Sequence, residues 1–398
     1  MMKLYIAKAS TGANGSYKQV VVSNAVDKIE QPRWVCIKML EIVYVTYVTT
    51  LIHILVSNPY AMKKYLFILF AFLVALNSFG QVKRPLPVID MHLHAIGADD
   101  QGPPPVKVGA PFAYFGYAEP KVNYGETFIG ALKTGAWNTV SISSPLTDDE
   151  LKQQTLAVLK ERNIYGVLSG DMTKVRQWKA TLPDRIINAV YWDFGILKHD
   201  KLDVDSLTKL FKSGEFKVFG EVAIQYEGIS AADPAMEPYF KMAEDLDIPV
   251  GIHLGTGPPG VSLLTKSRAR LGSALILEDV LVKHPKLRIY AMHAGWPMID
   301  DMIAMLYAYP QLYVDLGVIN YILPQKEFDF YLQRLVNAGF GKRVMYGSDQ
   351  MVWPGAIKIG IDRIEGASYL TKGQKRDILF NNATRFLELN AKQIAAMQ

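Results

Sequence analysis

The chain has 398 residues, and 43 Lys and Arg against 38 Asp and Glu give it a formal net charge of +5. Half of the residues are hydrophobic and only one is cysteine. These figures exclude a disordered chain, a collagen-like fibre and a disulfide-stapled miniprotein. The length suits one large α/β barrel or two ordinary domains. Because a basic chain can bind nucleic acid or an anionic membrane, the position of the charge matters.

The excess positive charge lies in the first 80 residues, which hold eight basic and three acidic side chains. The remaining 318 residues hold 35 of each and are electroneutral. The single cysteine, Cys36, also lies in the first 80 residues, so the rest of the chain suits an oxidising compartment. The net charge therefore gives no reason to expect a nucleic-acid partner.

Residues 62–80 have the pattern of a secretory signal peptide. A basic start precedes an apolar run of about 12 residues at 65–76, which is too short to span roughly 30 Å of hydrocarbon. The small residues Ser78 and Gly80 end the pattern, which predicts cleavage before Gln81. We therefore expect an exported protein, periplasmic or secreted, that is not held in the membrane after cleavage.

Signal peptides begin at the N-terminus, so residues 1–61 do not fit this pattern. We expect translation to start at Met62, with residues 1–61 an upstream extension that is not native. Residues 81–398 are then expected to form a single domain, which is about the length of one barrel.

From residue 87 onward, short β-branched runs alternate with amphipathic segments, which is typical of βαβ units and a parallel sheet. The expected strands are 88–93, 138–142, 164–168, 186–191, 217–222, 249–253, 287–292, 312–316 and 343–347. The expected helices include 148–162, 234–246, 272–283 and 327–338. Nine candidate strands exceed the eight of a (β/α)₈ barrel by one, and the surplus strand lies between 138 and 191. The long loops 97–120 and 255–260 directly follow strands, which in such a barrel places them on the catalytic face.

Several side chains that can bind a metal ion fall at the C-terminal ends of predicted strands. They are His92, His94, His253, His293 and Asp349. Strand alternation puts His92 and His94 on one face, about 7 Å apart along the strand, so both imidazoles can bind one ion. A sixth candidate, Glu221, closes the strand at 217–222.

An H-x-H pair, two later strand-end histidines and a terminal G-S-D resemble the amidohydrolase superfamily, in the branch that also contains aromatic-acid and muconate-semialdehyde decarboxylases. The resemblance covers about residues 86–390, including the closing helix 375–387. It implies a (β/α)₈ TIM barrel with a bound divalent metal, which we expect to be zinc, as one or two ions. By the resemblance, the ligands of the first ion are His92, His94, His253 and Asp349. His293 either binds a second ion or assists as an acid or base.

Glu221 bears on the number of ions. By the resemblance, members with two metals bridge them with a carboxylated lysine or a glutamate from strand four, whereas decarboxylases of this branch use one metal. Glu221 is such a bridge if its side chain points into the barrel, which alternation alone leaves open. Asp90 and Asp315 also lie in or at the end of strands, and we expect them to support the ligands rather than to react.

The donor set and the resemblance together predict a metal-dependent hydrolase that cleaves an amide, ester or lactone of a small organic acid through metal-activated water. Asp349 would accept the proton of the water and deliver it to the leaving group, and His293 would help to polarise the scissile carbonyl. Four aromatic side chains at or just after strand ends can wall an apolar substrate pocket, although each also suits barrel packing. They are Trp192, Tyr226, Trp296 and Trp353.

Two other functions remain open at this point. One is a non-oxidative decarboxylase, a lyase that acts on an aromatic or unsaturated carboxylic acid with one metal. The other is a metal-free binding protein on the same scaffold. The expected partner is a small-molecule substrate, and a homo-oligomer is left open.

Two motif matches and two histidines carry no expected function. Residues 255–260 match G-x-G-x-x-G after a strand, but the two prolines at 258 and 259 have no N–H to offer a pyrophosphate. Residues 193–195 copy the kinase D-F-G without its partner motifs. We expect His199 and His284 to be structural or solvated.

Overall fold

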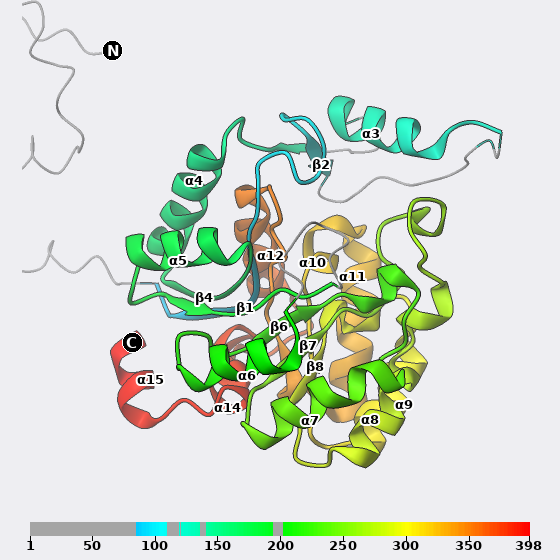
Figure 1. Ribbon diagram of the computed structural model, residues 1–398. Helices are drawn as coiled ribbons and strands as arrows, with labels where there is room; N and C mark the ends of the chain where they lie inside the picture. The colour runs from blue at the N-terminus through cyan, green and yellow to red at the C-terminus, as the bar shows by residue number, and fades with distance from the viewer. Residues whose placement is uncertain (1–84, 110–118, 120, 136–140, 194–201) are drawn as a thin grey trace, which may run out of the picture. The chain divides into compact units, whose positions relative to one another are not determined.

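The computed structural model describes residues 85–109, 119, 121–135, 141–193 and 202–398, and these residues fall within one compact unit (Figure 1). The predicted signal peptide at 62–80, the segment 1–61 that contains Cys36, and His199 lie outside the described residues. Within the described residues, no helix combines the length and the apolar character that crossing a membrane requires.

Within the described residues, eight parallel strands form the centre of the fold. They are β1 (Val88–Ala95), β4 (Ile164–Gly170), β5 (Ile186–Asn188), β6 (Phe219–Val222), β7 (Val250–Ile252), β8 (Ile289–Ala291), β9 (Leu312–Asp315) and β10 (Val344–Met345). They pair in the orders β1-β4-β5 and β10-β9-β8-β7-β6. A parallel bridge from Ala189 to Val218 joins β5 to β6, and the Met91 N–H donates to the Tyr346 carbonyl at 2.9 Å. The two sheets therefore meet at both seams, and the predicted (β/α)₈ barrel is confirmed.

The surplus predicted strand is 138–142. Of that range, 141 and 142 are described, and they belong to β3 (Ser141–Ser143), which pairs antiparallel with β2 (Lys107–Gly109) outside the barrel. The sequence could not identify this strand as the surplus one because its apolar, β-branched pattern is shared by barrel strands. β2, β3 and α3 (Tyr124–Thr134) all belong to the long connection from β1 to β4 (Figure 1).

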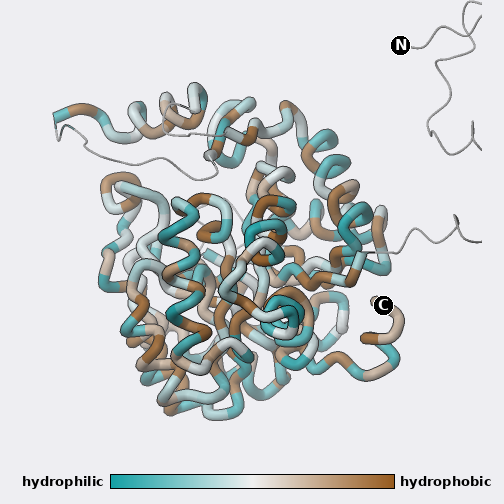
Figure 2. Tube along the Cα trace, turned by 180° about the vertical axis from the view of Figure 1, so that it is seen from behind, coloured by the Kyte–Doolittle hydropathy of each residue, from teal (hydrophilic) through white to brown (hydrophobic). Residues whose placement is uncertain are grey.

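Helices follow the barrel strands and carry hydrophobic residues among hydrophilic ones along the trace (Figure 2). The helices of the barrel are α4 (Asp148–Glu161), α5 (Met172–Thr181), α6 (Val204–Lys212), α7 (Glu237–Asp245), α8 (Glu278–Lys283), α9 (Ile299–Ala308), α10 (Ile319–Ile322), α11 (Gln325–Leu335) and α12 (Pro354–Gly366). Three short helices end the chain: α13 (Lys372–Arg376), α14 (Asn382–Phe386) and α15 (Ala391–Met397). Side chains of Thr147, Asp171 and Asp203 cap the first turns of α4, α5 and α6.

The predicted helix at 272–283 is wrong over its first half. Ala269–Gly272 and Ala274–Leu277 form 3₁₀ turns, and the α-helix begins only at Glu278. The Gly272 carbonyl accepts a hydrogen bond from the Gly255 N–H at 2.9 Å, so this segment bends to meet the loop that follows β7. The other predicted helices, 148–162, 234–246 and 327–338, correspond to α4, α7 and α11 with shifted ends.

The hydrophobic core has two parts. One fills the barrel interior with inward-facing strand residues such as Ile89, Met91 and Tyr290, and Phe380 and Phe386 belong to the same cluster. The other part is larger and lies between strands and helices. Because the interior is packed with side chains, polar groups can gather only beyond it, at the strand ends.

Candidate metal centre

Three elements bring their polar side chains together at the C-terminal ends of the strands. Glu221, in β6, places its Oε2 atom 3.3 Å from His92 Nε2 and 3.0 Å from His94 Nε2. Asp349, which follows β10, places its Oδ1 atom 3.1 Å from His94 Nε2. All four side chains are buried. The Glu221 side chain therefore points into the site, which the sequence left open.

A bulge in β1 brings its two histidines into the site. The pairing register of β1 with β4 shifts between Asp90 and Leu93. Such a shift puts two consecutive residues on one face, so Met91 packs in the barrel interior while His92 faces Glu221. The Asp90 carboxylate binds the backbone beside the cluster. Its Oδ1 atom accepts the backbone N–H of His92 at 3.0 Å and that of Ser348 at 2.8 Å, and so supports the strand end.

Asp349 is held by contacts on both sides of the seam between β10 and β1. Its backbone has a φ of 50°, a left-handed conformation that costs a residue with a side chain about 1–3 kcal/mol. The Asp349 N–H donates to the His92 carbonyl at 2.7 Å, and the Tyr321 hydroxyl donates to the Asp349 carbonyl at 2.9 Å. The Gln350 amide both donates to and accepts from the backbone of His94. Sequence reasoning missed Tyr321 and Gln350, because no motif signals a side chain that binds distant backbone.

The other half of the cluster contains His253 and His293, whose ring centroids lie 4.5 Å apart. His253 Nε2 is 3.9 Å from Glu221 Oε1 and 2.8 Å from the Tyr226 hydroxyl. Burial lowers the pKa of His253 to about 3, so this imidazole is neutral. His293 has a φ of 57°, and its Nδ1 atom donates to the Gly317 carbonyl at 2.9 Å. That hydrogen bond leaves the lone pair of His293 on Nε2.

Asp315, at the end of β9, fixes the orientation of two histidines. Its Oδ1 atom accepts the backbone N–H of His293 at 3.0 Å and that of Gly317 at 2.8 Å. Its Oδ2 atom lies 3.2 Å from His92 Nδ1. A carboxylate at this place favours the tautomer with the proton on Nδ1, which leaves His92 Nε2 free to bind a cation beside Glu221. The expected supporting role of Asp315 agrees with these contacts.

The carboxylates and the histidines of the cluster shift one another's pKa values. Burial disfavours a charged imidazole, but Glu221 and Asp349 raise the pKa of His94 to about 9 in spite of it. Asp349 likewise helps to hold the pKa of His92 well above its usual range against burial. Although burial opposes their ionisation, the two carboxylates keep pKa values below the usual range because of these histidines. A divalent cation would displace the protons of both imidazoles.

The donor set fits a metal ion of the zinc type, which takes imidazole nitrogen and carboxylate oxygen. Ligand atoms that lie within 4.8 Å of one another form three groups: His92, His94 and Glu221; Glu221, His253 and His293; His92, His293 and Asp315. Among the described residues, neither the buried Nδ1 of His253 nor the buried Nε2 of His293 has a hydrogen-bond partner. Since a buried acceptor without a partner is costly, a cation bound to the lone pair of His293 Nε2 would satisfy what the described residues alone do not.

The four aromatic residues predicted to line a pocket lie in different surroundings. Only Tyr226 hydrogen-bonds to a cluster residue, His253. Trp192 and Trp353 are almost fully buried in the outer core, and their indole N–H groups donate to the carbonyls of Leu202 and Val106. Trp296 is half-buried and donates to Glu327. Substrate contact by these residues stays a prediction.

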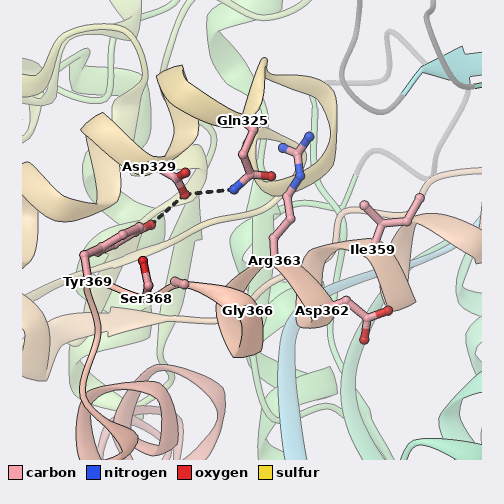
Figure 3. A pocket seen from close by; sticks show the side chains of 9 residues that line it. Gln325, Asp329, Ile359, Asp362, Arg363, Gly366, Ser368 and Tyr369 are labelled. Atoms are coloured by element: carbon pink, nitrogen blue, oxygen red, sulfur yellow. Dashed lines mark hydrogen bonds between the residues drawn. The ribbon is translucent and has the colours of Figure 1, made fainter.

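Other polar features lie apart from the cluster. His284 is buried between the acidic side chains of Glu237 and Glu244 and links α8 to α7, which fits the expected structural role. A cavity of about 500 Å³ is lined by residues of α11, α12 and the turn after α12, with none of the six candidate ligands among them. There, Asp329 accepts hydrogen bonds from Gln325 and Tyr369 (Figure 3).

The whole barrel matches one family of known proteins. The model of the amidohydrolase family matches residues 89–389, a range that contains all six candidate ligands. The chain belongs to the amidohydrolase family. Amidohydrolases of this kind generally bind a metal and act on small molecules.

Individual relatives of this amidohydrolase are distant. Protein fluG of Emericella nidulans is 22% identical over an alignment of 163 positions that covers 37% of this chain and 18% of that protein. The chain thus spans less than a fifth of the curated relative that it matches. An uncharacterised TIM-barrel protein of Bordetella bronchiseptica is 16% identical, with a TM-score of 0.50 over 78% of this chain and 100% of that one, and it supports the fold.

Two further solved structures are similar at lower scores. A probable 2-pyrone-4,6-dicarboxylic acid hydrolase of Acinetobacter baumannii is 14% identical, with a TM-score of 0.45 over 76% of this chain and 100% of that chain. A 2,6-dihydroxybenzoate decarboxylase of Rhizobium is also 14% identical, with a TM-score of 0.45 over 77% of this chain and 99% of that chain.

Proposed function

We propose that the chain is a metal-dependent hydrolase that cleaves an amide, ester or lactone of a small organic acid. The observation that carries this proposal is the position of Glu221. One of its oxygens contacts the nitrogens of His92 and His94, and the other lies 3.9 Å from His253 Nε2. A carboxylate shared in this way suits a two-ion site, and two-ion sites serve hydrolysis of stable bonds.

In this proposal, His92, His94 and Asp349 hold one ion, and Glu221 lies between it and a second ion. His253, which the resemblance assigns to the first ion, instead faces the second ion together with Glu221 and His293. Zinc ions bound there would polarise a substrate carbonyl and bring the pKa of a water molecule near 7. The remaining steps belong to the residues of the chain.

Asp349 is the proposed proton carrier. Its backbone is fixed by His92 and Tyr321, and its Oδ2 atom lies 3.8 Å from His293 Nδ1. The neighbouring imidazoles outweigh burial and keep its pKa below the usual range, so the carboxylate is ionised and can accept a proton. It can then deliver that proton to the leaving group, since its carboxylate is held at the rim of the same cluster.

His293 is the proposed ligand of the second ion, through which it would help to polarise the substrate carbonyl. Its backbone N–H and its Nδ1 atom are engaged with Asp315 and Gly317, so the ring cannot turn freely. Its Nε2 atom is buried and, among the described residues, has no partner. That nitrogen is available to the ion.

The test is a screen of the zinc-loaded protein over amides, lactones and aromatic acids in ¹⁸O-labelled water. Hydrolysis puts one labelled oxygen into the acid product, whereas decarboxylation releases carbon dioxide and leaves the product unlabelled. His92→Ala and Asp349→Asn are expected to lower activity by about three orders of magnitude or more, with the circular dichroism spectrum unchanged. Release of carbon dioxide, or full turnover by either variant, would contradict the proposal.

We also infer that the protein is exported. The support is the signal-peptide pattern at residues 62–80 and the absence of cysteine after residue 80. N-terminal sequencing of the native product is expected to begin at Gln81. A peptide from residues 1–60 would contradict the expected start at Met62.

A further inference from the structure

The Tyr226 hydroxyl occupies the nitrogen of His253 that faces the cluster. The hydroxyl lies 2.8 Å from His253 Nε2, and the same nitrogen is 3.9 Å from Glu221 Oε1. The other ring nitrogen, Nδ1, is buried and has no hydrogen-bond partner within the described part of the chain. A cation that binds His253 beside Glu221 therefore meets a nitrogen that already has a partner.

Tyr226 is held in this position by the loop that follows β7. It lies in a 3₁₀ turn, Ile224–Glu227, and its carbonyl accepts the N–H of Lys266 at 3.0 Å. Gly257 lies against the phenol, and a Cβ atom there would be 3.0 Å from Tyr226 Cε1. Gly257 also has a φ of +72°, so both its backbone and its lack of a side chain keep the loop close to the ring.

The hydrogen bond from Tyr226 uses the lone pair of His253 Nε2. An imidazole nitrogen accepts a hydrogen bond through its lone pair, and it binds a cation through the same lone pair. The Tyr226 hydroxyl, at 2.8 Å, and a cation therefore cannot both use His253 Nε2.

In the half of the cluster around β1, the described partners of His92 Nε2 and His94 Nε2 are carboxylates and not a hydroxyl. His94 Nε2 meets the carboxylates of Glu221 and Asp349 at 3.0 and 3.1 Å, and His92 Nε2 meets Glu221 at 3.3 Å. Asp315 contacts the opposite nitrogen of His92 and leaves Nε2 to these carboxylates. The two halves thus differ in what an incoming ion must displace.

We propose that the Tyr226 hydroxyl competes with a divalent cation for His253 Nε2, so that the chain binds its two ions in order. The first ion binds at His92 and His94, and the second binds more weakly at His253, because it has to break the hydrogen bond from Tyr226. This inference rests on the two-ion site of the proposed function, but it concerns binding alone and needs no substrate.

The test is a titration of the metal-stripped full chain with Co²⁺, followed by calorimetry and by the visible absorption bands of the bound ion. The wild type is expected to bind two ions in steps of unequal affinity. Tyr226→Phe keeps the ring against Gly257 and removes only the hydroxyl. Its second step is expected to be about 3- to 10-fold tighter, the worth of one hydrogen bond, with the first step unchanged.

The matched control is Tyr290→Phe. Tyr290 is a buried barrel tyrosine whose hydroxyl donates to the Met91 carbonyl and not to a candidate ligand. This variant is expected to leave both steps unchanged, which separates competition at His253 from the general effect of losing a buried hydroxyl.

Several outcomes would overturn the inference. A Tyr226→Phe variant that folds yet binds the second ion equally well or more weakly would show that the hydroxyl orients His253 rather than competes for it. Two equal steps in the wild type would contradict the binding order. One ion in the wild type and two in Tyr226→Phe would support competition, whereas one ion in both would refute the two-ion site as well. A wild type that fails to hydrolyse any substrate but shows the two unequal steps would overturn only the proposed reaction.

Discussion

Replacing Asp315 by Asn tests whether the candidate metal ligands depend on the residues behind them. Asp315 Oδ1 accepts the N–H groups of His293 and Gly317, so the amide oxygen of Asn is expected to keep this place. The amide NH₂ then faces His92 Nδ1, which lies 3.2 Å from Oδ2 in the native protein. Two donors cannot share that contact, so the proton of His92 moves to Nε2 and blocks the nitrogen that faces Glu221.

This change of tautomer is expected to lower the metal affinity. Removing the charge-assisted hydrogen bond is worth about 1.5–3 kcal/mol, and loss of such a supporting carboxylate lowers metal affinity about 10- to 100-fold. Competition of Zn²⁺ with a chromophoric chelator measures the affinity, and ¹⁵N NMR of the imidazole nitrogens identifies the tautomer. Asp329→Asn, which changes a carboxylate that binds Gln325 and Tyr369 instead, is expected to leave the affinity unchanged. Native affinity in Asp315→Asn, with the His92 proton still on Nδ1, would show that Asp315 does not set the tautomer of His92.

Three other outcomes are expected. Because Glu221 and Asp349 outweigh burial and raise the pKa of His94 to about 9, protons compete with the metal below that pH. Metal affinity, measured by titration, should rise by about tenfold per pH unit for each displaced proton and level off above about pH 9; a flat profile from neutral pH upward would contradict this. Gly257→Ala should lower the unfolding free energy in urea by about 1–2 kcal/mol, because its φ is +72°, whereas Gly130→Ala, with open space around its Cβ position, should not. Trp353→Phe loses the hydrogen bond to the Val106 carbonyl and core contacts, and should destabilise the fold by about 1–3 kcal/mol while metal affinity stays the same; reduced affinity would place Trp353 in the site.

The sequence predicted the ligand cluster because parallel barrel strands end on one face. That rule brings His92, His253 and Asp349 together without any knowledge of the loops. It needed only the strand positions, and short strands bounded by turn residues are readable in a chain whose apolar runs are distinct.

The remaining features depend on contacts that have no local signal. The bulge between Asp90 and Leu93 arises from pairing with β4, and the role of Asp315 depends on where β9 places its carboxylate. The surplus strand at 138–142 could be recognised only by its antiparallel partner, β2. The helix predicted at 272–283 failed because contact with Gly255 bends its first half, a tertiary effect that overrides local propensity.

In the proposed site, Glu221 joins two ions. Elemental analysis of metal per chain counts these ions, with zinc-loaded wild type and Glu221→Ala compared after the same dialysis. About two ions are expected in the wild type and one or fewer in the variant, with the fold retained. A single ion in the wild type that persists unchanged in Glu221→Ala would contradict the two-ion site.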